Sequence, residues 1–125
     1  MTRLEALADA IKTYEGWWWG SKSWRHNNPG NLRWSKFQTG QKNGFAYFNS
    51  FATGWLALWY DLWKKCRGET VTGLTGDSTL LNLFEKWAPW SDGNNPERYA
   101  DYIAKLLGVT TKTPLRFFIE DINSQ

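Results

Sequence analysis

Glu15 is the residue whose type and surroundings point most directly to chemistry. It ends a helix-periodic segment, is followed by Gly16, and precedes three consecutive tryptophans at 17–19. Apolar rings and the negative end of a helix dipole both disfavour the ionised form of a carboxyl group. A general acid must hold its proton near neutral pH, so Glu15 is the candidate proton donor.

The stretch that follows Glu15 has the composition of a carbohydrate-binding surface. Residues 16–60 contain no Asp or Glu, and they carry seven of the ten tryptophans. Five cations lie in the same stretch: Lys22, Arg25, Arg33, Lys36 and Lys42. Tryptophan rings pack well on the flat apolar faces of sugars and bases, which makes Trp24 a candidate binding residue.

Two polar segments could supply the remaining contacts. In Arg25-His-Asn-Asn-Pro-Gly-Asn-Leu-Arg33, the amides of Asn28 and Asn31 match sugar hydroxyl and acetamido groups, although turn asparagines bonded to their own backbone explain them equally well. In Trp87-Ala-Pro-Trp-Ser-Asp-Gly-Asn-Asn-Pro-Glu-Arg-Tyr99, a helix stop followed by a helix start accounts for the prolines, but less well for Trp90 and Tyr99.

Length and composition restrict the class of protein. The 125 residues suit one domain, here 1–125. Cys66 is the only cysteine and His26 the only histidine, so we expect no intrachain disulfide, no zinc site and no cofactor. The net charge of +3 favours acidic partners such as nucleic acid, anionic lipid or the bacterial cell wall. The amino terminus lacks the apolar core of a signal peptide, and no stretch reaches the ~20 apolar residues of a membrane span.

Hydrophobic periodicity and capping residues predict the elements that would position these groups. We expect helices over 3–15, from Ser50 to Gly68, from Asp77 or Ser78 to Pro89, from Asn94 or Asn95 to Gly108, and a short one after Thr113-Pro114. Lys42-Asn43-Gly44 predicts a β-hairpin, and 16–35 reads as a long ordered loop. The prediction is one mostly α domain (α+β) of about five helices with a small hairpin.

Several of these segments together resemble the phage-type lysozyme-like lytic transglycosylases over roughly residues 4–109. The resemblance is carried by Glu15-Gly16, the Arg25–Arg33 segment, Gly44-Phe-Ala-Tyr-Phe48, Gly54, Trp87-Ala-Pro, Asn94-Asn-Pro-Glu-Arg-Tyr99 and Leu107-Gly-Val109. It implies a lysozyme-like fold with a cleft between the helical part and the hairpin lobe. Glu15 would be the catalytic acid, Asn28 and Asn31 would shape the cleft floor, and Tyr99 would approach the acid from the late helix.

The chain departs from the family pattern at three places. Gly16 follows the acid where the broader group has Ser, and His26 replaces the first Asn of a triple-Asn run. The run of tryptophans at 17–19 has no counterpart in the pattern.

The absence of a second acid separates the candidate reactions. Glycosidases generally use two carboxylates about 5 Å apart for retention or about 6.5–9.5 Å apart for inversion. No acid lies between Glu15 and Asp61, which favours the one-acid lytic transglycosylase reaction on the β-1,4 bond after N-acetylmuramic acid. A hydrolytic lysozyme that uses Asp92 remains an alternative, as do a non-catalytic glycan or nucleic-acid binder and an inactive virion component.

These expectations imply partners and a place of action. We expect peptidoglycan strands as the partner, with no nucleic acid and no stable membrane insertion. The chain would be a monomer or a module of a phage particle or lysis system. It would be made in the host cytoplasm and act in the periplasm or cell wall, alone or on a virion.

Overall fold

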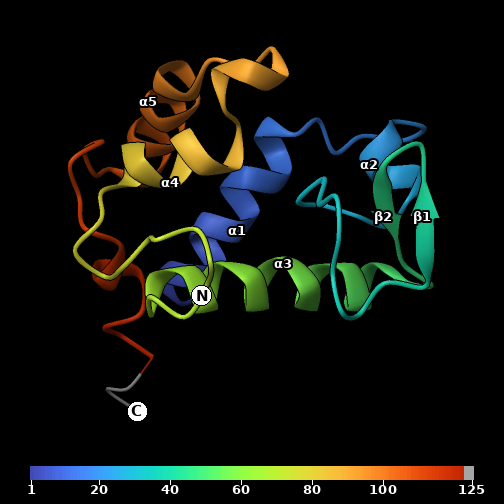
Figure 1. The fold of residues 1–125 in the computed structure, drawn as a ribbon, viewed down its shortest axis with the longest axis horizontal. Helices are drawn as coiled ribbons and strands as arrows, with labels where there is room; N and C mark the ends of the chain where they lie inside the picture. The colour runs from blue at the N-terminus through green and yellow to red at the C-terminus, as the bar shows by residue number, and fades with distance from the viewer. Residues whose placement is uncertain (123–125) are drawn as a thin grey trace. The chain divides into compact units, whose positions relative to one another are not determined.

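The computed structural model describes residues 1–122, which are mostly helical with one small antiparallel sheet (Figure 1). The elements in chain order are α1 (Arg3–Tyr14), α2 (Lys22–Arg25), β1 (Gly40–Lys42), β2 (Phe45–Tyr47), α3 (Phe51–Cys66), α4 (Leu80–Trp87), the 3-10 helix η1 (Trp90–Asp92), α5 (Pro96–Leu107) and the 3-10 helix η2 (Leu115–Phe118). The predicted class, mostly α with a small β element, is confirmed.

The chain groups into two compact units. Unit 1 comprises residues 1–7 and 63–125, of which 1–7 and 63–122 are described, and unit 2 comprises residues 8–62. Helices α1 and α3 contribute residues to both units. Within the described residues, no helix has the length and apolar character needed to cross a membrane.

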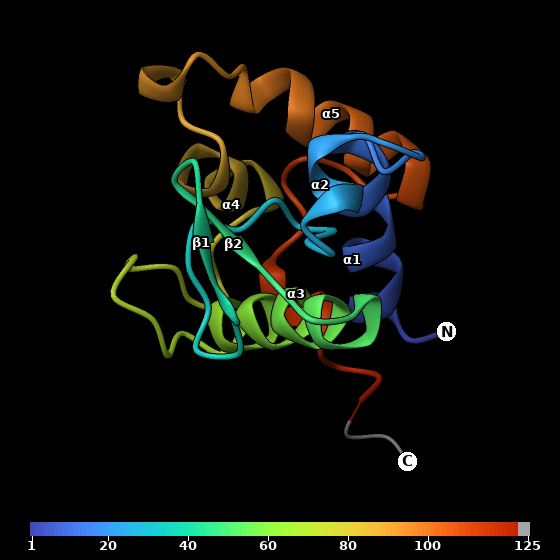
Figure 2. The ribbon, with the colours of Figure 1, turned by 90° about the vertical axis from the view of Figure 1, so that its right-hand side faces the viewer.

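Unit 2 is organised around the hairpin and the first part of α3. Strands β1 and β2 pair antiparallel, with Lys42 opposite Phe45 (Figure 2). Asn43 and Gly44 connect them with φ of 53° and 79°, the backbone that a two-residue hairpin turn requires. The buried apolar side chains of this unit are Ala8, Ala10, Ile11, Leu32, Ala46, Phe48, Ala57, Leu58 and Leu62.

Unit 1 is built on the packing of α4 against α5. The rings of Phe84 and Tyr99 stack with centroids 4.2 Å apart and an interplanar angle of 18°. Helix α5 begins after the N-cap Asn95 with Pro96 in its first turn, and ends at Gly108 in the left-handed conformation. Its expected start and end are confirmed.

The expected start of one helix is wrong, and two other segments differ in type from the expectation. Helix α4 begins at Leu80 rather than at Asp77 or Ser78, because Thr79 caps it and forms a capping box with Asn82. The segment 16–35 is not loop throughout, since it contains the single-turn helix α2. The expected last helix is a 3-10 helix, η2.

Candidate functional site

Glu15 occupies the C-cap of α1. Its backbone N–H still donates to the carbonyl of Ile11 at 2.9 Å, so helical hydrogen bonding continues to this residue. Gly16 then turns into the left-handed region with φ of 81°, and its N–H donates to Thr13 O at 3.1 Å. The N–H of Trp17 donates to Lys12 O at 3.3 Å, which completes a Schellman motif. This motif fixes the half-buried Glu15 at the carbonyl end of the helix.

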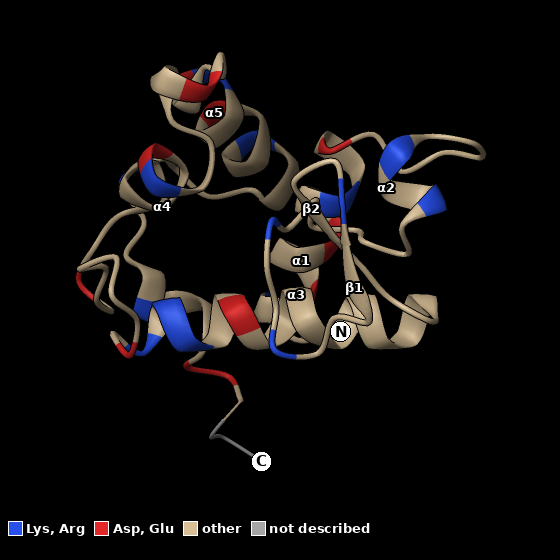
Figure 3. Cartoon of the chain, turned by 45° about the vertical axis from the view of Figure 1, so that its right-hand side comes forward, with Lys and Arg blue, Asp and Glu red and all other residues tan. Residues whose placement is uncertain are grey.

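Lys22 is a cation whose charge interacts with that of Glu15. Burial lowers the pKa of Lys22, while the negative charge of Glu15 acts in the opposite direction and that of Arg33 adds to the lowering. The ammonium Nζ lies 3.3 Å from the centroid of the Phe45 ring, so a strand of the hairpin also holds this side chain. The site therefore combines one acid with a partly desolvated cation. Figure 3 shows basic residues and no acidic ones on α2.

The short helix α2 brings this cation into place. Ser21 caps it, with its Oγ accepting from Trp24 N–H at 3.3 Å, and Ser23 Oγ donates to Gly16 O at 3.4 Å. Ser23 is 2 % exposed, so the bond to Gly16 is buried. Sequence reasoning missed this helix. The available signal was Ser21 as an N-cap residue directly before the helix.

Asn28 braces the backbone of the loop. Its side chain is fully buried, and Nδ2 donates to Leu32 O at 2.8 Å and to Ala46 O at 3.0 Å. Its Oδ1 accepts from Leu32 N–H at 2.9 Å. Both amide protons are thus used inside the protein. The expected contact of Asn28 with a substrate is corrected to a structural role that joins the loop to β2.

The neighbouring asparagines also serve the turn. Asn27 and Asn31 have positive φ of 53° and 50°, which asparagine adopts more readily than most residues. Asn27 Nδ2 donates to Phe48 O at 3.0 Å, whereas the N–H of Asn31 donates to Asn28 O at 3.0 Å. Of the two asparagines predicted to bind substrate, Asn28 is fully buried and Asn31 is half-buried. Only Asn31 therefore reaches the surface.

His26 is the C-cap residue of α2, and its surroundings lower its pKa. Burial lowers its pKa, and the cations Lys22, Arg25 and Lys42 lower it further, against an opposing contribution from the backbone of Ala46. Its Nδ1 is buried without a hydrogen-bond partner among the described residues. Its surroundings therefore disfavour a positive charge on His26.

The remaining predicted residues fall on both units. Trp24 is exposed on α2 in unit 2. In unit 1, Trp90 and Asp92 are exposed on η1. Tyr99 is only 2 % exposed, and its ring stacks on Phe84 in the core of unit 1. Its expected approach to the acid from the late helix stays a prediction.

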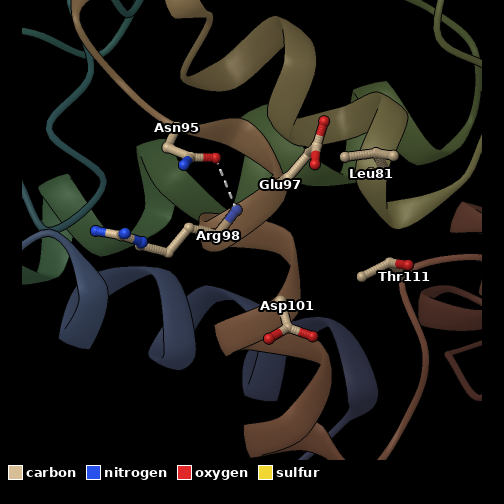
Figure 4. A pocket seen from close by; sticks show the side chains of 6 residues that line it. All are labelled: Leu81, Asn95, Glu97, Arg98, Asp101 and Thr111. Carbon is tan, nitrogen blue, oxygen red and sulfur yellow. Dashed lines mark hydrogen bonds between the residues drawn. The ribbon is translucent and has the colours of Figure 1, made fainter.

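A separate pocket of about 530 Å³ lies in unit 1 along α5 (Figure 4). Its lining residues are Leu81, Asn95, Glu97, Arg98, Asp101 and Thr111. Asn95 Oδ1 accepts from Arg98 N–H, and Asp101 forms an ion pair with Lys105 at 2.9 Å. These groups stabilise α5 itself, and none of them belongs to the predicted site.

Among residues 1–122, no three His, Cys, Asp or Glu side chains are grouped so that they could hold a metal ion. Cys66 is buried on α3, and burial raises the pKa of its thiol to about 12, which makes it a poor nucleophile or ligand. Comparison of the chain with protein-family models, curated proteins and solved structures finds no match.

Proposed function

We propose that the chain is a peptidoglycan lytic transglycosylase in which Glu15 is the single catalytic acid and base. The observation that carries the proposal is the placement of Glu15. It is half-buried, fixed by the Schellman turn at the end of α1, and followed by 45 residues, 16–60, without a carboxylate. The hairpin that follows α1 along the chain supports a lysozyme-like fold.

The nearest other carboxylate on α1 is poorly placed to act with Glu15. Asp9 precedes it by six residues, which is ~9 Å along a helix axis and ~120° around it. Asp9 also forms an ion pair with Lys12 at 3.3 Å. A second carboxylate from residues 16–60 is excluded by the sequence, and this favours a reaction that needs only one.

In the proposed reaction, Glu15 first donates its proton to the oxygen of the β-1,4 glycosidic bond. The bond from C1 of N-acetylmuramic acid to that oxygen breaks, and the substrate's own N-acetyl carbonyl stabilises the positive centre. The carboxylate of Glu15 then takes the proton of the C6 hydroxyl. The O6–C1 bond closes a 1,6-anhydro ring, and Glu15 is restored to its protonated state.

Replacing the acid tests the assignment. Glu15→Gln should keep the fold and lower the rate of peptidoglycan clearing at least about 100-fold, since positioned acid–base groups contribute roughly 10²–10⁴-fold. Asp9→Asn is the matched control on the same helix and should retain near wild-type activity. If Glu15→Gln clears peptidoglycan at the wild-type rate, Glu15 is not the catalytic acid.

The products distinguish the two enzymatic mechanisms. Mass spectrometry of the digested glycan should show 1,6-anhydro ends, which are 18 mass units lighter than hydrolysed ends because no water is added. A two-carboxylate lysozyme would instead produce reducing ends, and the Asp92→Asn variant would no longer produce them. As partner and place of action we propose the glycan strands of the bacterial wall, reached from a phage lysis system or particle.

A further inference from the structure

The three consecutive tryptophans have three different environments within unit 2. Trp17 packs against Phe51, with ring centroids 5.1 Å apart. Trp19 pairs with Trp24 of α2 at 5.7 Å. Trp18 instead lies on the backbone of Gly16, the residue that directly follows the proposed acid. The triplet therefore comprises a ring packed on Phe51, a ring against Gly16, and one member of an exposed aromatic pair.

The contact between Trp18 and Gly16 requires glycine. A Cβ at position 16 would lie 2.2 Å from Cζ3 and 2.5 Å from Cη2 of the Trp18 ring. Position 16 also has φ of 81°, which disfavours other residues independently. Glycine at position 16 thus allows the indole ring to lie against the backbone of the residue that follows Glu15. Trp18 remains 65 % exposed, so much of this ring is open to solvent.

Hydrogen bonds within the loop hold the main chain at Trp18. Its N–H donates to Ser21 Oγ at 3.4 Å, and its carbonyl accepts from Ser21 N–H at 3.0 Å. The carbonyl of Gly16 accepts from the buried Ser23 Oγ at 3.4 Å. These bonds restrict the backbone conformation of the residues on both sides of Trp18.

We propose that Trp18 is the stacking platform for the pyranose ring bound next to the bond that Glu15 cleaves. Indole faces pack on the apolar C–H face of sugars, and this ring lies against the residue that follows the acid. Lys22, whose charge interacts with that of Glu15, and Arg25 lie on helix α2 shortly after Trp18, and their positive charge suits a glycan that bears carboxylates. The inference rests on the proposed function.

Trp34 provides a matched control. Trp34 is also 65 % exposed and belongs to the same unit. The ring that lies against Gly16 is that of Trp18. We would measure binding of the cleavage-deficient Glu15→Gln protein to purified peptidoglycan and to soluble chitin oligosaccharides. Adding Trp18→Ala should weaken both affinities on the order of 10-fold, as for other aromatic stacking contacts. Adding Trp34→Ala should change them less than about twofold, and Trp18→Phe should restore part of the loss.

Kinetics and competing ligands complete the test. In the otherwise wild-type chain, Trp18→Ala should raise KM more than it lowers kcat, while circular dichroism and Tm confirm folding. If the Trp18→Ala variant binds glycan as tightly as the Trp34→Ala variant, the proposal is overturned. A Trp18-dependent affinity for phosphatidylglycerol vesicles or single-stranded DNA without one for glycan would also overturn it.

The two proposals fail separately. If Glu15→Gln stays active while Trp18→Ala loses glycan affinity, Glu15 is not the catalytic acid. Trp18 is then still a residue that binds sugar. If Glu15→Gln is inactive and Trp18→Ala binds glycan normally, only the proposed stacking role of Trp18 is wrong.

Discussion

Asn28 shows how a residue typical of ligand binding can instead hold a site together. Its amide joins Leu32 and Ala46, which are also linked by the bond from Ala46 N–H to Leu32 O at 3.0 Å. The loop after α2 and strand β2 therefore share one buried polar cluster. A buried amide with its groups satisfied specifies a single loop conformation, since any alternative leaves polar atoms unpaired.

Removing this amide should destabilise the fold. Asn28→Ala leaves Leu32 N–H and Ala46 O without their side-chain partner, at about 1–3 kcal/mol for each unsatisfied buried group. We expect a loss of about 3 kcal/mol and a Tm lower by roughly 10 °C, measured by thermal unfolding. Asn49→Ala, at an exposed position in the same unit, should stay within ~0.5 kcal/mol. Equal Tm values for the two variants would contradict the bracing role.

The residues of the site were only partly predictable from sequence. The spacing of Leu4, Leu7 and Ile11 with Gly16 locates the end of the helix, and the end of the helix locates Glu15. Residue type alone leaves the direction of an amide open, because Asn28 could face either a ligand or a carbonyl. Its direction depends on Ala46 of β2, which is 18 residues further along the chain and is reached only by tertiary contact.

At the scale of elements, α3 and the asparagine-rich turn are in direct backbone contact. A Cβ at Gly54 would lie 1.7 Å from Asn27 O and 3.1 Å from Pro29 Cδ. The turn therefore rests on the helix surface itself. Gly30 is similarly close, with a Cβ there lying 2.7 Å from Leu58 Cδ1 of the same helix. Small residues on both sides permit this approach.

Gly54→Ala tests the contact, because two effects oppose each other. Helix propensity alone would stabilise α3 by about 1 kcal/mol. The clash with a backbone carbonyl cannot be relieved by side-chain rotation, and overpacking of this kind costs about 1–3 kcal/mol or more. We expect net destabilisation in urea unfolding. Ala52→Gly, at an exposed position of α3, should lose about 1 kcal/mol, as propensity predicts. A more stable Gly54→Ala protein would rule out the close approach.

Elements with strong local signals were predictable, and those that depend on distant partners were not. Asn95-Pro96 and Asn43-Gly44 carry their own start and turn chemistry, and both form as expected. A four-residue helix such as α2 is too short to be stable alone, and it is held through Ser23 and Gly16. Ser78 and Thr79 are both good caps. The structure uses Thr79 as the cap of α4, and Thr79 also forms an isolated β-bridge with Pro114.

At the scale of the whole molecule, the net charge is confined to one part of the chain. Residues 8–62 contain six Lys or Arg and three Asp or Glu, a net charge of +3. The remaining residues contain nine of each sign and are neutral, so these two values add to the total of +3. The surplus therefore belongs to the unit that carries Glu15, Trp18 and Lys22. Composition alone gives the total charge, and the division into units gives its location.

This asymmetry predicts how ionic strength affects binding to the two kinds of glycan. Raising NaCl from about 0.1 M to 1 M shortens the Debye length from roughly 10 Å to 3 Å. The affinity of Glu15→Gln for carboxylate-bearing peptidoglycan should then fall, because attraction to unit 2 is screened. Its affinity for uncharged chitin oligosaccharides should stay nearly constant, since stacking on Trp18 is apolar. Sedimentation with sacculi and fluorescence titration with the oligosaccharides measure the two. Equal salt dependence for both glycans would mean that the positive charge of residues 8–62 does not act on the wall.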